Sequence, residues 1–180
     1  MKFIFYSPVS FEKWDWLISV EKGIGGSETS HVEMAWRLAK RGHEVITYAP
    51  IPDDCPRQWR GTIWKKLEEA DFKQKGIWVL YRCPDVLDKF TRKHEGQELW
   101  LMMQDEGYGS WNKARGKKVD KVLALCTEHA KVTKKRHPYL ADKVVITGNG
   151  VKVDLIREVE MKSKIKRNPY KLIYASSPDR

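Results

Sequence analysis

The sequence predicts an α/β fold in which helices cover both faces of a Rossmann-like parallel sheet. Short, nearly continuous apolar runs such as Lys2 to Pro8 recur along the chain, and they are typical of strands buried on both faces. Amphipathic segments such as Ser27 to Arg41 stand between these runs, with apolar residues at helical spacing. Because strands and helices alternate, the pattern favours parallel strands joined by helices.

The other elements follow in chain order from the same two patterns. Strands are predicted at Lys2 to Pro8, His43 to Ala49, Ile77 to Tyr81, Leu99 to Met103, within Val119 to Cys126, at Lys143 to Thr147 and at Lys171 to Ala175. Helices are predicted at Ser27 to Arg41, Pro84 to Phe90, Thr127 to His137 and Asp154 to Met161, whereas Thr62 to Phe72 suits a short helix or an irregular segment. Gly42 follows the first helix, where glycine commonly ends one. Thr127 is predicted to cap the third helix, and Pro138 stops it.

The segment from Gly23 to Glu28 places glycines directly before the first long helix. Free N–H groups and the helix dipole favour an anion at a helix start, and glycines let the backbone approach it. A phosphate-bearing ligand at this loop is therefore one hypothesis. The alternative is a flexible loop with an ordinary cap, in which Ser27 is the N-cap. The glycines lack the G-x-G-x-x-G spacing of dinucleotide-binding folds.

Composition and charge narrow the class of protein. The 180 residues are 41% hydrophobic, enough for one sizeable folded domain, and carry a formal net charge of +10. This charge favours anionic partners, among them nucleotides, nucleic acid and acidic membrane surfaces. Cys55, Cys83 and Cys126 form no C-x-x-C pair, which argues against a disulfide framework or a zinc site, and Cys126 is expected in the core. No secretory or membrane-spanning segment is recognisable, so a cytoplasmic protein is expected, with peripheral membrane contact at most.

Several segments, taken in order, resemble the N-terminal half of GT-B retaining glycosyltransferases of family 4. The matching segments are Gly25-Gly26-Ser27-Glu28, Arg41-Gly42-His43-Glu44-Val45, Val122 to His129, Lys143 to Val151 and Leu172 to Arg180. Each segment alone has modest specificity, and their joint occurrence in the family's order carries the resemblance.

The resemblance implies two Rossmann-like domains that face each other across a cleft. Residues 1–161 would form the N-terminal acceptor domain, 162–169 a linker, and 170–180 the first strand of a nucleotide-sugar-binding domain. The complete enzyme would transfer a sugar from a nucleotide-diphosphate sugar to a hydroxyl of a glycan or lipid-linked acceptor, with retention. No metal or cofactor is expected. The chain by itself is expected to have little or no activity, because most donor contacts would lie beyond Arg180.

The resemblance also assigns site residues. The residues that would contact the donor phosphates are Gly25, Gly26, Ser27 and Arg180. The acceptor-binding candidates are Glu28, Trp14, Trp16, Asp105 and Glu106. The catalytic candidates, Gln104 and Asp105, stand where the family commonly has a histidine–aspartate pair. Glutamine can donate a hydrogen bond but cannot titrate, so any acid–base role of that histidine is not available here.

Two other classes of function stay open at this point. A truncated chain could bind a glycan or an anionic lipid without turnover, since basic runs and tryptophans such as Trp14 and Trp16 suit both ligands. The net charge also suggests a nucleic-acid-binding domain, although no nucleic-acid-binding motif is present and no specific nucleic acid is expected. His31 is expected to be packed or solvated rather than to bind a ligand. Self-association is expected through the exposed cleft wall or the terminal strand.

Overall fold

The computed structural model describes residues 1–10, 12–91, 94–105, 109–163, 168 and 170–171. It divides the chain into two units, Met1–Asn149 and Gly150–Arg180. The first unit holds the sheet and every buried residue among those described.

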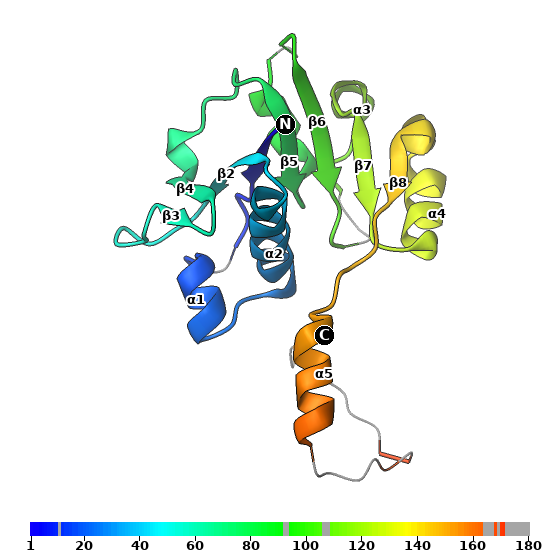
Figure 1. Cartoon of the computed structure of the whole chain (residues 1–180). Helices are drawn as coiled ribbons and strands as arrows, with labels where there is room; N and C mark the ends of the chain where they lie inside the picture. The colour runs from blue at the N-terminus through cyan, green and yellow to red at the C-terminus, as the bar shows by residue number, and fades with distance from the viewer. Residues whose placement is uncertain (11, 92–93, 106–108, 164–167, 169, 172–180) are drawn as a thin grey trace. The chain divides into compact units, whose positions relative to one another are not determined.

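The first unit is built on one sheet (Figure 1). Its strands within the described residues are β1 (Lys2–Tyr6), β2 (Glu44–Ala49), β3 (Gln58–Trp59), β4 (Thr62–Lys66), β5 (Gly76–Tyr81), β6 (Gln97–Met102), β7 (Lys121–Ala124) and β8 (Val144–Ile146). Their order is β3-β4-β2-β1-β5-β6-β7-β8. All neighbouring pairs are parallel except β3 with β4, which form an antiparallel hairpin. The predicted α/β class with a mostly parallel sheet is confirmed.

Helices cover both faces of this sheet. They are α1 (Trp16–Glu21), α2 (Gly26–Lys40), α3 (Lys113–Lys118) and α4 (Thr127–Arg136), with 3-10 segments η1 (Leu67–Glu69), η2 (Pro84–Lys89) and η3 (Pro138–Lys143). On one face, Phe3 and Phe5 pack with Ala35 of α2, which lies in front of the sheet in Figure 1. On the other face, Ile4 packs in a cluster that includes Leu87 of η2. Successive side chains of a strand point to opposite faces, which places Phe3 and Ile4 on different sides.

The expectation of a helix or irregular segment at Thr62 to Phe72 is wrong in its first half. That half is strand β4, in which Thr62 and Trp64 are buried while Ile63 and Lys65 are only partly so. Alternate burial of this kind is typical of a half-buried strand. The strand has only five residues and two of them are lysines, so the alternation is hard to recognise in the sequence. The short elements α1, β3 and α3 also lacked a sequence prediction, whereas the short helix predicted at Pro84 to Phe90 is present as the 3-10 segment η2.

The predicted caps of two helices are each wrong by one or two residues. Helix α2 begins at Gly26 with Gly25 as its N-cap, so Ser27 lies inside the first turn. Helix α4 has Cys126, not Thr127, as its N-cap. Cys126 is exposed, which also corrects the expectation that it belongs to the core. Gly42 follows α2 with a φ of 83°, in the left-handed conformation that glycine adopts most readily after a helix.

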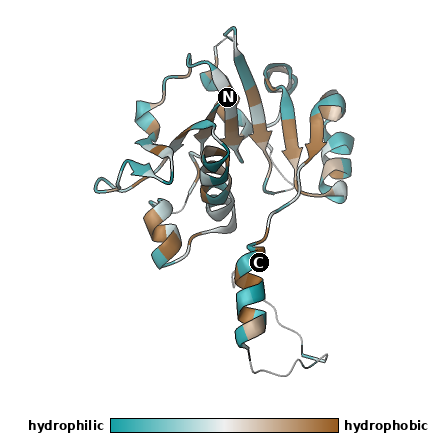
Figure 2. Ribbon diagram, viewed as in Figure 1, coloured by the Kyte–Doolittle hydropathy of each residue, from teal (hydrophilic) through white to brown (hydrophobic). Residues whose placement is uncertain are grey.

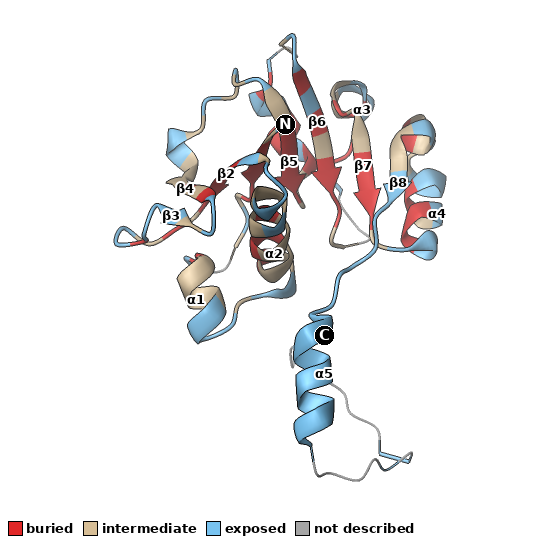
Figure 3. Cartoon of the chain, viewed as in Figure 1, coloured by how far each residue is buried: buried red, intermediate tan, exposed pale blue. Residues whose placement is uncertain are grey.

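The second unit contains helix α5 (Val153–Lys162), close to the predicted Asp154 to Met161. None of its residues is buried, and the whole helix is pale blue in Figure 3. The first unit ends at Asn149, and the domain boundary expected at residue 161 stays a prediction. The predicted linker at 162–169 lies mostly outside the described residues, as does the predicted strand after Lys171. Lys171 itself is described and belongs to no helix or strand.

Candidate functional site

The parallel strands bring several polar residues to one edge of the sheet. Ser7 follows β1, Arg82 follows β5, Asp105 lies shortly after β6, and Cys126 lies shortly after β7. These four strands are neighbours in the order β1-β5-β6-β7. Ligands of open α/β sheets bind beyond the carboxyl ends of strands, so a site is expected where these four strands end.

Three charged side chains meet at this edge. One guanidinium nitrogen of Arg82 lies 3.0 Å from Oδ2 of Asp105, and another lies 3.9 Å from Oε1 of Glu28. The side chains of Arg82 and Glu28 are 17% and 10% exposed, whereas that of Asp105 is 39% exposed. We call Glu28, Arg82 and Asp105 the carboxyl-edge network. Its arginine is largely withdrawn from solvent, and Asp105 is the carboxylate that a ligand can reach most easily.

The backbone of Arg82 is held in an uncommon conformation. Its φ is 69°, in the left-handed region that residues with a side chain rarely adopt. The Arg82 N–H donates a hydrogen bond of 3.0 Å to the carbonyl of Met102, so the pairing of β5 with β6 fixes this conformation. Strained residues of this kind gather at functional sites because only a surrounding structure maintains them.

Glu28 lies against the glycine turn. A Cβ placed on Gly25 would lie 2.3 Å from Oε2 of Glu28, whereas one placed on Gly26 would have no atom within 4 Å. A carboxylate near a helix start is favoured by the helix dipole, which explains why Glu28 of the first turn of α2 can be buried. An anion at the start of α2 would therefore meet Glu28 at Gly25 and open space at Gly26.

His31 follows Glu28 by about one turn on α2 and is packed among aromatic rings. It is fully buried, its ring lies 4.9 Å from that of Tyr81 and 5.1 Å from that of Phe5, and neither ring nitrogen has a hydrogen-bond partner within the described part of the chain. Burial lowers the pKa of His31 to about 3, so the ring is neutral at physiological pH. The expectation that His31 is packed holds, and the ring supplies no charge to the network.

The two tryptophans expected to contact an acceptor lie in different environments. Trp14 is 2% exposed and packs edge-on against His31, with ring centroids 5.2 Å apart. It is a core residue and presents no surface to a ligand, which corrects the sequence expectation. Trp16 is half-buried in α1, stacks on Trp59 of β3 at 5.1 Å, and donates its indole N–H to the carbonyl of Pro56. Its contacts are with the β3 hairpin rather than with the network.

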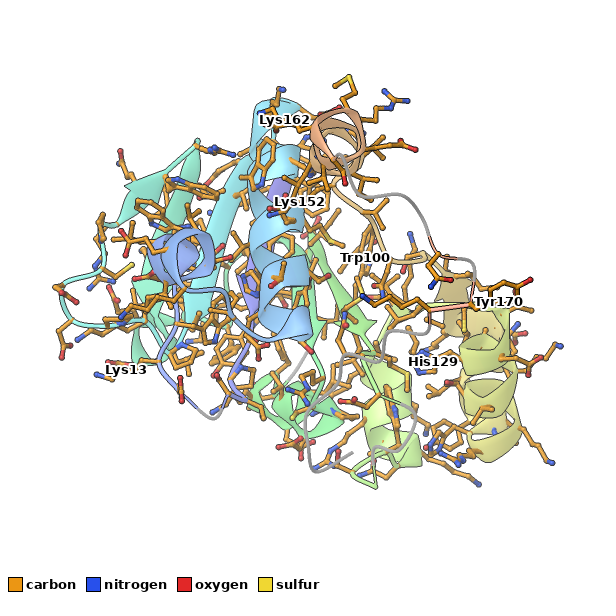
Figure 4. All side chains as sticks on the ribbon, turned by 90° about the horizontal axis from the view of Figure 1, so that it is seen from below. Lys13, Trp100, His129, Lys152, Lys162 and Tyr170 are labelled. Atoms are coloured by element: carbon orange, nitrogen blue, oxygen red, sulfur yellow. The ribbon has the colours of Figure 1, made fainter. Side chains whose placement is uncertain are left out.

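The start of α4 adds a histidine to the same edge. The Cys126 side chain accepts a hydrogen bond of 3.4 Å from the His129 N–H, and Nδ1 of His129 accepts one of 3.4 Å from the Leu125 N–H. His129 is buried on the side of α4 that faces the sheet (Figure 4). An accepting Nδ1 assigns the proton of the neutral ring to Nε2, which has no partner among the described side chains.

Of the remaining predicted site residues, two are described by the structure and two are not. Gln104 is half-buried beside Asp105, and Ser27 is half-buried in the first turn of α2. Glu106 and Arg180 lie outside the described residues. Sequence reasoning did not select Arg82, although an arginine placed directly after an apolar strand was a usable signal, since the carboxyl ends of parallel strands carry sites.

Within the residues that the structure describes, no group of three or more His, Cys, Asp or Glu side chains is placed to hold a metal ion. None of the described helices combines the length and the apolar character needed to cross a bilayer. No protein-family model matches the chain, and no curated protein matches its sequence significantly.

Proposed function

We propose that this chain is the acceptor-binding part of a glycosyltransferase, which moves a sugar from a nucleotide-diphosphate donor to a hydroxyl acceptor. The observation that carries this proposal is the carboxyl-edge network, in which Asp105 and Glu28 are brought together by Arg82. The parallel α/β fold and the ordered segments that resemble family 4 support it. The fold by itself hosts many activities, so the proposal depends on the site.

The chemistry of the network suits a sugar hydroxyl. Carboxylate oxygens accept hydrogen bonds from hydroxyl groups, and these bonds are stronger than those between neutral groups. Arg82 engages Oδ2 of Asp105, which holds the carboxylate in place, and the Asp105 side chain is 39% exposed, so an acceptor hydroxyl can approach it. Gln104 adds an amide that can donate and accept, and no proton transfer is assigned to it.

The donor side of the proposal rests on the start of α2. Gly26 offers open space above its backbone, and free N–H groups at a helix start favour a phosphate. Ser27 follows directly and carries a hydroxyl in the same turn. Asp105 and the glycine turn would then contact the two substrates on the same edge of the sheet, which is the proximity that transfer requires.

The test is binding of sugars, measured by ligand-observed NMR with free hexoses and with lactose and maltose. Asp105→Asn removes the charge of the exposed carboxylate, and we expect about a tenfold loss of affinity, the effect of one charge-assisted hydrogen bond. Asp88→Asn is the matched control. Asp88 also pairs with an arginine, Arg115, but it lies on η2 and is not part of the carboxyl-edge network. Equal binding by both variants, or no binding of any sugar to the parent chain, would contradict the proposal.

A further inference from the structure

A second cluster of side chains lies at the β3 edge of the sheet. Trp16 of α1 stacks on Trp59 of β3, and Trp36 of α2 meets Trp59 edge-on with ring centroids 6.5 Å apart. The guanidinium carbon of Arg60 lies 4.7 Å from the Trp59 ring centroid and 4.9 Å from that of Trp36, and that of Arg37 lies 4.5 Å from the Trp36 centroid. We call these five residues the tryptophan–arginine cluster.

Arg60 occupies an unusual place for an arginine. It and Gly61 are the residues between β3 and β4, with φ values of 46° and 81°. Two-residue hairpin turns with both φ values positive strongly prefer asparagine before glycine. Arg60 therefore costs the turn some stability, and its long side chain gains two cation–π contacts in exchange.

The two arginines of the cluster differ in charge balance. Arg37 pairs with Glu33 at 3.2 Å. Arg60 is exposed, and no carboxylate of the described residues lies within ion-pair distance of it. The aromatic rings hold its guanidinium in place without neutralising it. The cluster thus presents a fixed positive charge that is ready to meet an anion.

Helix α1 adds partly exposed apolar side chains beside this charge. Its sequence is Trp-Leu-Ile-Ser-Val-Glu, none of its residues is buried, and Val20 is 68% exposed. The hydrophobic residues of α1 appear brown in Figure 2. An apolar segment next to a fixed cation matches the boundary between lipid headgroups and acyl chains, where aromatic and apolar side chains enter and arginines meet phosphate.

The covered ring faces decide between possible ligands. Sugars and single-stranded bases bind tryptophan by stacking on an open ring face. In the cluster, Trp16 stacks on Trp59, and the guanidinium groups of Arg60 and Arg37 lie over the Trp59 and Trp36 rings, so these two rings offer little open face. We propose that α1 and the tryptophan–arginine cluster form a docking surface for membranes that contain anionic phospholipids. This inference is independent of the proposed acceptor site.

The experiment is co-sedimentation of the full chain with phosphatidylcholine vesicles, with and without about 30 mol% phosphatidylglycerol. Arg60→Asn removes the charge and supplies the residue that this turn prefers, so the fold is retained. We expect the partition coefficient on anionic vesicles to fall about fivefold, the contribution of one basic residue near such a surface. Val20→Ser should weaken binding about threefold, because an apolar side chain no longer enters the interface.

Lys135→Asn is the matched control. It removes the same charge from α4, which packs against β8 at the opposite edge of the sheet from β3. We expect little change from it. Equal losses for Arg60→Asn and Lys135→Asn would overturn the proposal in favour of diffuse charge. Equal binding to neutral and anionic vesicles, or no sedimentation with either, would overturn it outright. Release from vesicles by single-stranded RNA, with RNA binding that depends on Arg60, would assign the surface to nucleic acid instead.

Discussion

Two arginines with the same backbone strain act in opposite ways in the two halves of the sheet. Arg82 at the carboxyl edge and Arg60 in the β3 hairpin both have positive φ. Arg82 is largely buried between two carboxylates, whereas Arg60 is exposed and held by tryptophan rings. The charge of Arg82 is taken up by the two carboxylates that it positions. The charge of Arg60 stays exposed to solvent. The comparison teaches that the partners of an arginine, more than the residue type, decide whether its charge is neutralised or stays exposed.

The largest effect that we expect concerns the buried, neutral ring of His31. Unfolding returns His31 to its ordinary pKa near 6.5, whereas the folded ring stays neutral down to a pH of about 3. The unfolded chain therefore binds the extra proton, and stability falls as pH drops below 6.5, by about 3 kcal/mol at pH 4. In His31→Phe this part of the loss should vanish in urea unfolding curves recorded between pH 7 and pH 4. An unchanged slope would mean that the folded protein protonates His31 as readily as the unfolded chain does, which would contradict its burial as a neutral ring.

The next effect comes from Arg82→Asn. Asparagine tolerates a positive φ better than most residues, so the substitution removes the charge without adding backbone strain. Glu28 would lose its cation while still buried, and we expect the free energy of unfolding to fall by about 2 kcal/mol. Chemical denaturation at neutral pH measures this loss. A loss below about 0.5 kcal/mol, the scatter of ordinary surface substitutions, would show that the network is not coupled.

The smallest effect is expected from the same substitution at the other arginine. Arg60→Asn loses two cation–π contacts but gains the residue that the turn prefers, and these contributions nearly cancel. The free energy of unfolding should change by no more than about 0.5 kcal/mol. The same denaturation series measures it beside Arg82→Asn. Similar losses for both variants would break the comparison, because Arg60 would then be a structural residue.

The elements that could be predicted from the sequence are those long enough to show a regular pattern of apolar residues. β1, β2, β5 and α2 are long enough for their apolar patterns to be read directly. β3, α1 and α3 were missed because elements this short contain too few residues to show a hydrophobic period. α1 and β3 also depend on a contact between them, the stacking of Trp16 on Trp59. Glu28 and Asp105 were selected from sequence, but the arginine that joins them was not, since pairing across β5 and β6 becomes visible only in three dimensions.

The two tryptophans illustrate the same limit. Trp14 and Trp16 are separated by one residue and are the same residue type, yet Trp14 lies in the core and Trp16 is half-buried in the tryptophan–arginine cluster. Which of two nearby aromatic residues is buried depends on the direction of the loop before α1. The Trp14 N–H, which donates to the carbonyl of Pro50 after β2, is part of what sets that direction.

The most direct test of the comparison is an amide chemical-shift titration of the isotope-labelled chain with lactose and maltose. Hydroxyl ligands should shift the amides of Gly26, Glu28, Arg82 and Asp105 and leave those of Trp59 and Arg60 in place. Shifts that gather at Trp59 and Arg60, or a spectrum that does not respond at either region, would contradict the assignment of sugar binding to the carboxyl-edge network.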